Sequence, residues 1–489
     1  MKQKLMTFIL LAALTAQLAA CGGGGSAPDG NDDSSASEST AAETDYLERY
    51  SDIDFGGEVY TFATNSDEQY PNYIGDELNG ETVNDVQYER DVWVESTYNV
   101  SIEYINYFGK DLNQAVRTQV MAGDTTIDCL EAPMSYCLGT LSTEGLLYNL
   151  KDVDGLDLDA SWWSRTMNDE FTVNDKLYTT TGPIAFSYYY SPRLVAYNLR
   201  LADEYKLDDL YEVVEAGKWT LDYMYDSMKS VTNDLDGDGV MGDDDMWGAS
   251  VDEYSAAGFY ISAGGTQTSI ASDGSPVFHF DEDKNYTRID KVASIIGNAE
   301  ITQKAEKLAS RSGSYNILDK VYTFKNGHAL YLGYGAQAIA FYLRDMQDDY
   351  GILPVPKYDE NQENYITFGN AFVPAYIAIP ANNNRQSMNG ILLNTLGYIS
   401  QRDVQPLVSS VMLKGKAARD EGSIKMIDII YEDIYLDLNS CYNFGNSFIL
   451  LRDITMGNKE NFKSGWESIK SSAETSFGKL IEQFDAIDE

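Results

Sequence analysis

Residues 58–64 read EVYTFAT and directly follow the glycine pair at 56–57, which is typical of a β-strand that starts after a turn. Apolar residues at helical spacing cover 83–98, and the alternating stretch VSIEYIN comes next at 100–106. A second helical face then leads to another strand pattern, TIDCLEA, at 126–132. This order of strand, helix, strand, helix and strand predicts an α/β fold with a mostly parallel sheet.

The rest of the chain also mixes strand and helix patterns. RLVAYN at 193–198 reads as a strand, and one helix is expected between it and Gly217. Thr220 is the predicted N-cap of a further helix over 220–230. The last segment places apolar side chains on one stripe, which predicts a long amphipathic helix with a buried face formed by Phe462, Trp466, Ile469, Phe477, Leu480, Ile481 and Phe484.

The first 21 residues read as a secretory signal peptide, with basic Lys2 and Lys4, an apolar run, and the cleavage region Leu-Ala-Ala-Cys at 18–21. This tail resembles a bacterial lipobox, so we expect Cys21 to carry a lipid; an ordinary signal peptide with a chance cysteine is the alternative. We expect residues 22–50, rich in Gly, Ser and acids, to form a disordered linker. The globular body would then be held at the outer face of the cell membrane.

The composition excludes several classes of function. A net charge of −42 repels nucleic acid and anionic lipid, although it also serves solubility. The chain has only two histidines, His279 and His328, and contains no nucleophile-elbow, zinc-protease or phosphate-loop motif. The sequence therefore offers few histidines for a catalytic triad, and we do not expect an enzyme.

Residues 234–245, DLDGDGVMGDDD, match the ligand spacing of an EF-hand calcium loop, with Gly239 at the sharp turn. Two features depart from that motif: the twelfth position is Asp rather than Glu, and the next residues, MWGASV, read as a strand rather than a helix. We therefore expect a structural Ca²⁺ site that stabilises the loop rather than a calcium-sensor site. An acidic turn without bound calcium is the alternative. The predicted ligands are Asp234, Asp236, Asp238, the Val240 carbonyl and Asp245.

Four segments carry a resemblance to a known family: KLYTTTGPIAFSYYYSPRLVAYN at 176–198, GKWTLDYM at 217–224, KNGHALYLGYG at 325–335 and YGILPVPKYDENQENY at 350–365. Together, and in this order, they resemble the extracellular solute-binding proteins of bacterial ABC importers, in the carbohydrate-type family 1 group. The resemblance covers most of the chain from about residue 52 to the end.

The resemblance implies a two-lobe, periplasmic-binding-protein-like α/β fold with a hinge and an interlobe cleft. Mapped onto this chain, lobe one comprises 52–182 and 366–415, and lobe two comprises 183–365 and 416–489, with the acidic loop in lobe two. Such proteins bury a solute by lobe closure and then dock on a membrane permease. The implied protein is a monomer that binds a small solute and, apart from its lipid, neither membrane nor nucleic acid.

Sugar recognition needs apolar ring faces beside hydrogen-bonding groups, and ligands of such sheets lie beyond the carboxyl ends of strands. Candidates at strand ends and lobe crossovers are Asn65, Asp67, Glu131, Tyr136, Tyr189, Tyr190, Tyr334, Asn370 and Asn443. For each tyrosine, a place in the core or at the surface is the alternative. For the whole chain, the alternatives are an importer receptor for a peptide or another small polar solute, and a secreted glycan-active enzyme or adhesin.

Overall fold

The computed structural model describes residues 46–65, 77–107, 111–372, 374–407, 421–432 and 434–486. The chain divides into two compact units, Met1–Asp52 and Ile53–Glu489. In the first unit the described residues form one short helical turn, where the rings of Tyr46 and Tyr50 lie edge to face at 6.0 Å.

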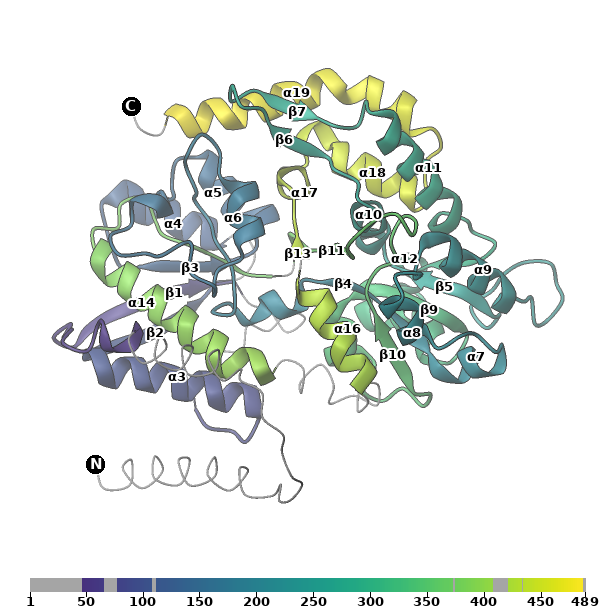
Figure 1. The fold of residues 1–489 in the computed structure, drawn as a ribbon. Coiled ribbons are helices and arrows are strands. Elements are labelled where there is room, and N and C mark those ends of the chain that lie inside the picture. Colours follow the sequence, from purple (N-terminus) through teal and green to yellow (C-terminus); the bar gives the residue numbers. More distant parts are fainter. Residues whose placement is uncertain are drawn as a thin grey trace, which may run out of the picture. The chain divides into compact units, whose positions relative to one another are not determined.

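A four-stranded sheet has the strand order β12-β3-β1-β2, and Figure 1 labels its strands β1, β2 and β3. Its strands are β1 (Glu58–Thr64), β2 (Val100–Asn106), β3 (Cys129–Ala132) and β12 (Tyr376–Ala378). β1 is parallel to β2 and to β3, whereas β12 is antiparallel to β3. The helices α3 (Thr82–Tyr98) and α4 (Asp111–Ala122) connect the parallel strands, which confirms the predicted alternation.

Helices cover both faces of this sheet. The Tyr60 hydroxyl donates to Asn389 Oδ1 of α14 (Gln386–Ile399) at 2.8 Å. Ala63 instead clusters with Leu112 and Val116 of α4. Since side chains alternate along a strand, residues 60 and 63 point to opposite faces, and each face meets its own helix.

A five-stranded mixed sheet has the order β10-β4-β9-β5-β8. β4 is antiparallel to β9 and β10, and β5 is parallel to β8 and β9. The start of β4 therefore lies at the same edge as the carboxyl ends of β5 and β9. The strands are β4 (Arg193–Asn198), β5 (Trp247–Val251), β8 (Thr302–Lys304), β9 (Ala329–Gly335) and β10 (Tyr350–Leu353).

Short elements complete this part of the chain. Thr220 caps α9 as predicted, because its side chain accepts the Tyr223 N–H. The hairpin β6 (Thr268–Ile270) and β7 (Pro276–Phe278) forms a separate two-stranded sheet. The helices are α5 (Gly139–Thr143), α6 (Arg165–Phe171), α9 (Leu221–Val231), α10 (Glu253–Ser262), α11 (Asp283–Ile296), α12 (Ala305–Leu308), α13 (Tyr322–Lys325) and α16 (Glu421–Glu432).

The prediction of one helix between residue 198 and Gly217 is wrong. The segment forms two helices, α7 (Leu199–Glu204) and α8 (Leu210–Glu215). Lys206 has the left-handed φ of 56°, which ends the first helix. The Asp209 side chain then accepts the N–H groups of Tyr211 and Glu212 and starts the second.

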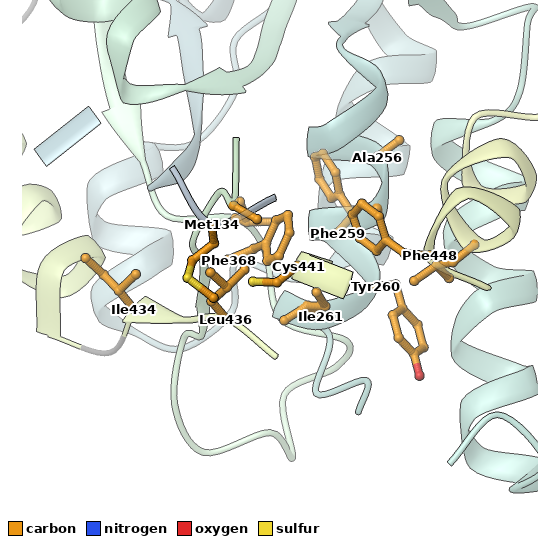
Figure 2. Packing of buried hydrophobic residues seen from close by; sticks show 14 of the residues in the cluster. Met134, Ala256, Phe259, Tyr260, Ile261, Phe368, Ile434, Leu436, Cys441 and Phe448 are labelled. Carbon is orange, nitrogen blue, oxygen red and sulfur yellow. The ribbon is translucent and has the colours of Figure 1, made fainter. Parts of the chain in front are cut away.

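Two short strands, β11 (Thr367–Phe368) and β13 (Ile434–Tyr435), pair in parallel. The core around them is continuous: Met134, which follows β3, belongs to one buried cluster with Phe368 and with Phe259 of α10 (Figure 2). This cluster joins residues next to the first sheet to a helix that packs on the second. The predicted lobe boundaries near 182, 365 and 415 stay a prediction.

The C-terminal residues form α17 (Leu438–Tyr442), α18 (Ser447–Thr455) and α19 (Phe462–Ala486). The predicted apolar stripe of α19 is confirmed, with Ile469 only partly buried. At its end, Phe484 meets Tyr178 edge to face at 4.7 Å, and Lys176 Nζ donates to the Phe484 carbonyl. The last helix is thereby tied to the segment at 176–178.

Candidate functional site

Three predicted site residues meet at the carboxyl edge of the first sheet. The Asn65 N–H donates to the Glu131 carbonyl at 3.1 Å, and the Tyr136 hydroxyl donates to Asn65 Oδ1 at 3.4 Å. They come from the ends of β1 and β3 and from the helical turn that follows β3. Parallel neighbours bring their carboxyl ends to one edge, which is why residues 66 positions apart are adjacent. Asp67 lies outside the described residues.

Glu131 faces a small polar cavity beneath this edge. The cavity volume is about 10 Å³, at the lower limit for one water molecule. Gln87 Oε1 is buried and has no hydrogen-bond partner among the described residues. The lining consists of Gln87, Arg90, Tyr104 and Glu131 with the apolar Phe62, Ile184 and Leu396.

Burial, together with the charges around this cavity, sets the protonation of Glu131. Burial raises the pKa of Glu131 from 4.5 to about 7, against the opposing effect of the Arg90 cation. Arg90 is itself paired with Asp91 at 2.8 Å and donates to Ser400 Oγ at 2.9 Å. Asp91 also accepts the Tyr104 hydroxyl at 2.8 Å. Because burial outweighs the attraction of the Arg90 cation, and the Asp91 anion repels a second negative charge, Glu131 is not fully ionised at neutral pH.

The three tyrosines predicted to stack on a ligand lie in the core. Tyr189, Tyr190 and Tyr334 are 2%, 1% and 2% exposed and belong to one buried cluster. Phe186 and Phe341 pack edge to face on Tyr190, with centroids at 5.3 and 4.9 Å. Protein side chains therefore occupy the surroundings of these rings, as in the core alternative, and a stacking role on a ligand stays a prediction.

The two remaining candidates make local hydrogen bonds. Asn370 is 3% exposed, and its Oδ1 accepts the Phe372 N–H at 2.8 Å. Asn443 has a left-handed φ of 48° at the end of α17, and its Oδ1 accepts the Ile449 N–H at 3.1 Å. Both side chains thus shape the turns in which they lie, and their contact with a ligand stays a prediction.

A buried ion pair at the matching edge of the second sheet was missed by the sequence reasoning. Arg193, the first residue of β4, contacts Asp252 directly after β5 at 3.2 Å. Arg193 Nε, Ser191 Oγ and Gln337 Oε1 are buried there and have no hydrogen-bond partner among the described residues. The sequence signal that could have indicated this ion pair was an arginine at the first position of a mostly apolar strand, since Arg is rarely buried without a partner.

The acidic loop gathers three carboxylates. Oxygens of Asp234, Asp236 and Asp245 lie within 4.8 Å of one another, and Asp245 is buried. Asp238 is outside this group, with Oδ1 accepting the Val240 N–H at 2.7 Å.

The backbone folds around these carboxylates. Both Asp234 oxygens accept backbone N–H groups, from Gly237 at 2.7 Å and Gly239 at 2.8 Å. Hydrogen bonds from Gly239 and Gly237 lower the pKa of Asp234. The other two grouped carboxylates are held in the same way, because Asp236 Oδ1 accepts the Asp238 N–H at 3.0 Å and Asp245 Oδ1 accepts the Leu235 N–H at 2.8 Å. Their oxygen donors suit Ca²⁺.

The described residues contain no helix with both the length and the apolarity needed to span a bilayer. No protein-family model matches the chain, and no curated protein does.

Solved structures of similar fold include three whose titles name a sugar transporter or a protein in complex with a saccharide. A sugar transporter of Rhizobium etli in an open conformation is 13% identical, with 88% of this chain and 99% of that chain covered at a TM-score of 0.55. A cyclo/maltodextrin-binding protein complexed with maltotetraose is 12% identical, covering 88% and 96% at 0.53. An ABC substrate-binding protein of Listeria monocytogenes, in complex with cycloalternan, is 13% identical, covering 88% and 98% at 0.52. The chain therefore has the two-lobe α/β fold of these periplasmic-binding-protein-like ABC substrate-binding proteins.

Proposed function

We propose that this protein is a solute-binding receptor that closes on a carbohydrate and delivers it to the permease of an ABC importer. The supporting observation is that polar groups collect at the carboxyl edges of both sheets, where ligands of such folds bind. Asn65 and Glu131 lie at one edge, and Arg193 and Gln337 lie at the other. Of these groups, Arg193 Nε and Gln337 Oε1 are buried and have no hydrogen-bond partner among the described residues, which suits a hydroxyl-rich ligand because a ligand can satisfy them.

The remaining parts of the proposal rest on the lipobox-like motif at 18–21 and on the similar solved structures. Cys21, which lies outside the described residues, carries the lipid that holds the protein at the outer face of the membrane. The protein acts as a monomer, contacts permease subunits, and binds its solute without turning it over. The three neighbouring proteins named above bear titles of binding or transport.

Saccharides are expected to stabilise the purified protein against heat. A ligand that binds only the folded state adds about 2.7 kcal/mol at 100 times its Kd. Thermal unfolding would be measured with a library of oligosaccharides and a parallel library of short peptides. Stabilisation by peptides alone would replace the carbohydrate proposal with the peptide alternative, and release of smaller sugars would replace it with an enzyme.

An Asn65→Ala variant locates the binding site. It is expected to weaken saccharide binding at least about 10-fold, because loss of one ligand hydrogen bond in a dry site costs about 1.5 kcal/mol. Asn361→Ala, which removes an exposed amide from a surface turn, is the matched control. Equal affinities in the two variants would remove the edge of the first sheet from the site.

We further propose that the acidic loop binds a structural Ca²⁺ through Asp234, Asp236 and Asp245, with Asp238 and the Val240 carbonyl completing the set. Ca²⁺ at ten times its Kd is expected to raise the free energy of unfolding by about 1.4 kcal/mol in the wild type and not in Asp236→Asn. Asp244→Asn, one residue before Asp245, controls for charge. Calcium stabilisation that survives in Asp236→Asn would identify the loop as a bare acidic turn.

A further inference from the structure

The β6–β7 hairpin and the turn before α11 bring a serine, a histidine and a glutamate into successive contact. Figure 1 labels β6, β7 and α11. Ser269 Oγ lies 2.8 Å from His279 Nε2, and His279 Nδ1 lies 2.6 Å from Glu282 Oε1. This is the order of contacts in which an imidazole can deprotonate a serine while a carboxylate holds its other nitrogen.

The charge on Glu282 fixes the tautomer of His279. Lys284 Nζ contacts the second Glu282 oxygen at 2.8 Å, and hydrogen bonds from Lys284 and then His279 lower the pKa of Glu282. An ionised carboxylate can only accept, so His279 Nδ1 carries the proton. In the neutral ring Nε2 then has the lone pair, and the Ser269 hydroxyl donates to it.

The backbone holds this arrangement in place. The His279 N–H donates to the Gln267 carbonyl at 2.9 Å, across the hairpin. Asn285, fully buried in α11, donates to the His279 carbonyl at 2.8 Å. Glu282 stands at the N-cap of α11, yet its side chain caps nothing there and accepts from His279 instead. The three residues are therefore positioned by a strand, a fixed turn and a helix start.

Ser269 is reachable, and a backbone donor lies next to it. Ser269, His279 and Glu282 are each half-buried rather than enclosed. The hydrogen-bonded positions of the hairpin alternate, and Ile270 stands opposite Pro276 in a non-bonded position. The Ile270 N–H therefore points away from β7, at the outer edge of a two-stranded sheet. In acyl transfer, the N–H after the nucleophile is a donor suited to the developing oxyanion.

We propose that Ser269 is an activated nucleophile that accepts an acyl group from small activated esters, with His279 as its base. Oγ attacks the carbonyl carbon while its proton passes to Nε2, which gives a tetrahedral oxyanion. The bond between that carbon and the leaving oxygen then breaks, and Nε2 returns the proton to the leaving group. The product is an ester of Ser269, formed without any oxidant or reductant. This reactivity is separate from solute binding.

The test uses the full mature protein and p-nitrophenyl acetate. One p-nitrophenolate per chain is expected, together with one acetyl group that peptide mass spectrometry locates on Ser269. Ser269→Ala should remove that label, and His279→Gln should slow acetylation about 100-fold, the lower range for loss of a general base. Ser275→Ala is the matched control, because Ser275 lies in the same hairpin and bonds to Asp273 instead of a histidine.

The role of Glu282 needs its own readout, because it acts through His279. Glu282→Gln is expected to slow acetylation, since its amide can donate to Nδ1 and so favour the tautomer in which Nε2 carries the proton, and Glu282→Asp should restore part of the rate because it keeps an anionic acceptor. Thermal unfolding and saccharide binding of each variant establish that it is folded. Acetylation of folded Ser269→Ala at the wild-type rate, or of His279→Gln at that rate, would overturn the proposal.

Discussion

An Asp252→Ala variant is expected to unfold with a free energy about 3–5 kcal/mol below that of the wild type. Arg193 and Asp252 have side chains only 2% and 4% exposed, so alanine leaves a buried arginine without its anion. Asp252 Oδ1 also accepts the Ser255 N–H at 2.9 Å and caps α10, so the helix loses its cap as well. The midpoint of urea unfolding, followed by tryptophan fluorescence, measures the effect.

Two further variants separate the ion pair from a general loss of charge. Arg193→Met with Asp252→Leu is expected to recover much of the lost stability, because no lone charge stays buried. Glu144→Ala breaks the half-exposed pair of Arg117 and Glu144 and should cost less than about 1 kcal/mol. If Asp252→Ala lowered the free energy of unfolding no more than Glu144→Ala, the buried ion pair would contribute no more to stability than the half-exposed one.

Much of the fold could be predicted because the strands and helices keep clear hydrophobic periods. The strand at 58–64 follows a glycine turn and is buried on both faces from Tyr60 onward, and the stripe of α19 is set by the side chains that face the core. The helix expected before Gly217 failed for a local reason. Lys206 adopts a left-handed backbone that ends α7, and Asp209 starts a new helix. Helix-capping residues and hydrophobic periodicity can predict different helix boundaries, and one sequence does not show which of the two signals sets the boundary.

The site was less predictable because most of it depends on pairing between distant segments. Asn65, Glu131 and Tyr136 could be grouped, since the topology rule alone brings strand ends together. Tyr189 and Tyr190 were harder, because a tyrosine suits a core and a ligand surface equally well.

The remaining two groups of residues could not be predicted, because they meet only when the strands pair in the observed order and register. Arg193 meets Asp252 only once β4 and β5 are placed on either side of β9. Ser269 meets His279 only in the register of the β6–β7 hairpin. Two histidines therefore seemed too few for triad chemistry, although one of them is held in that arrangement.

The protein is expected to be more stable at pH 5 than at pH 8, in large part because of Glu131. Its pKa is about 7 in the folded protein against an ordinary 4.5, so the folded state holds a proton that the unfolded state has released. Stability is then full below about pH 4.5 and is lost as pH rises through about 7. A shift of this size corresponds to about 3 kcal/mol. Burial also raises the pKa of Glu170 to about 7 and of Asp437 to about 6, which acts in the same direction.

A Glu131→Gln variant isolates this effect from the repulsion of a chain with net charge −42, which also grows with pH. Glutamine keeps the shape of the protonated side chain, so the variant should match the wild type near pH 4.5 and exceed it by up to about 3 kcal/mol at pH 8. Glu103→Gln, at an exposed position of β2, controls for the loss of one negative charge. Unfolding free energies measured across this pH range test the prediction. Parallel curves for Glu131→Gln and wild type would mean that Glu131 is ionised in its cavity and that the Arg90 cation outweighs the effect of burial.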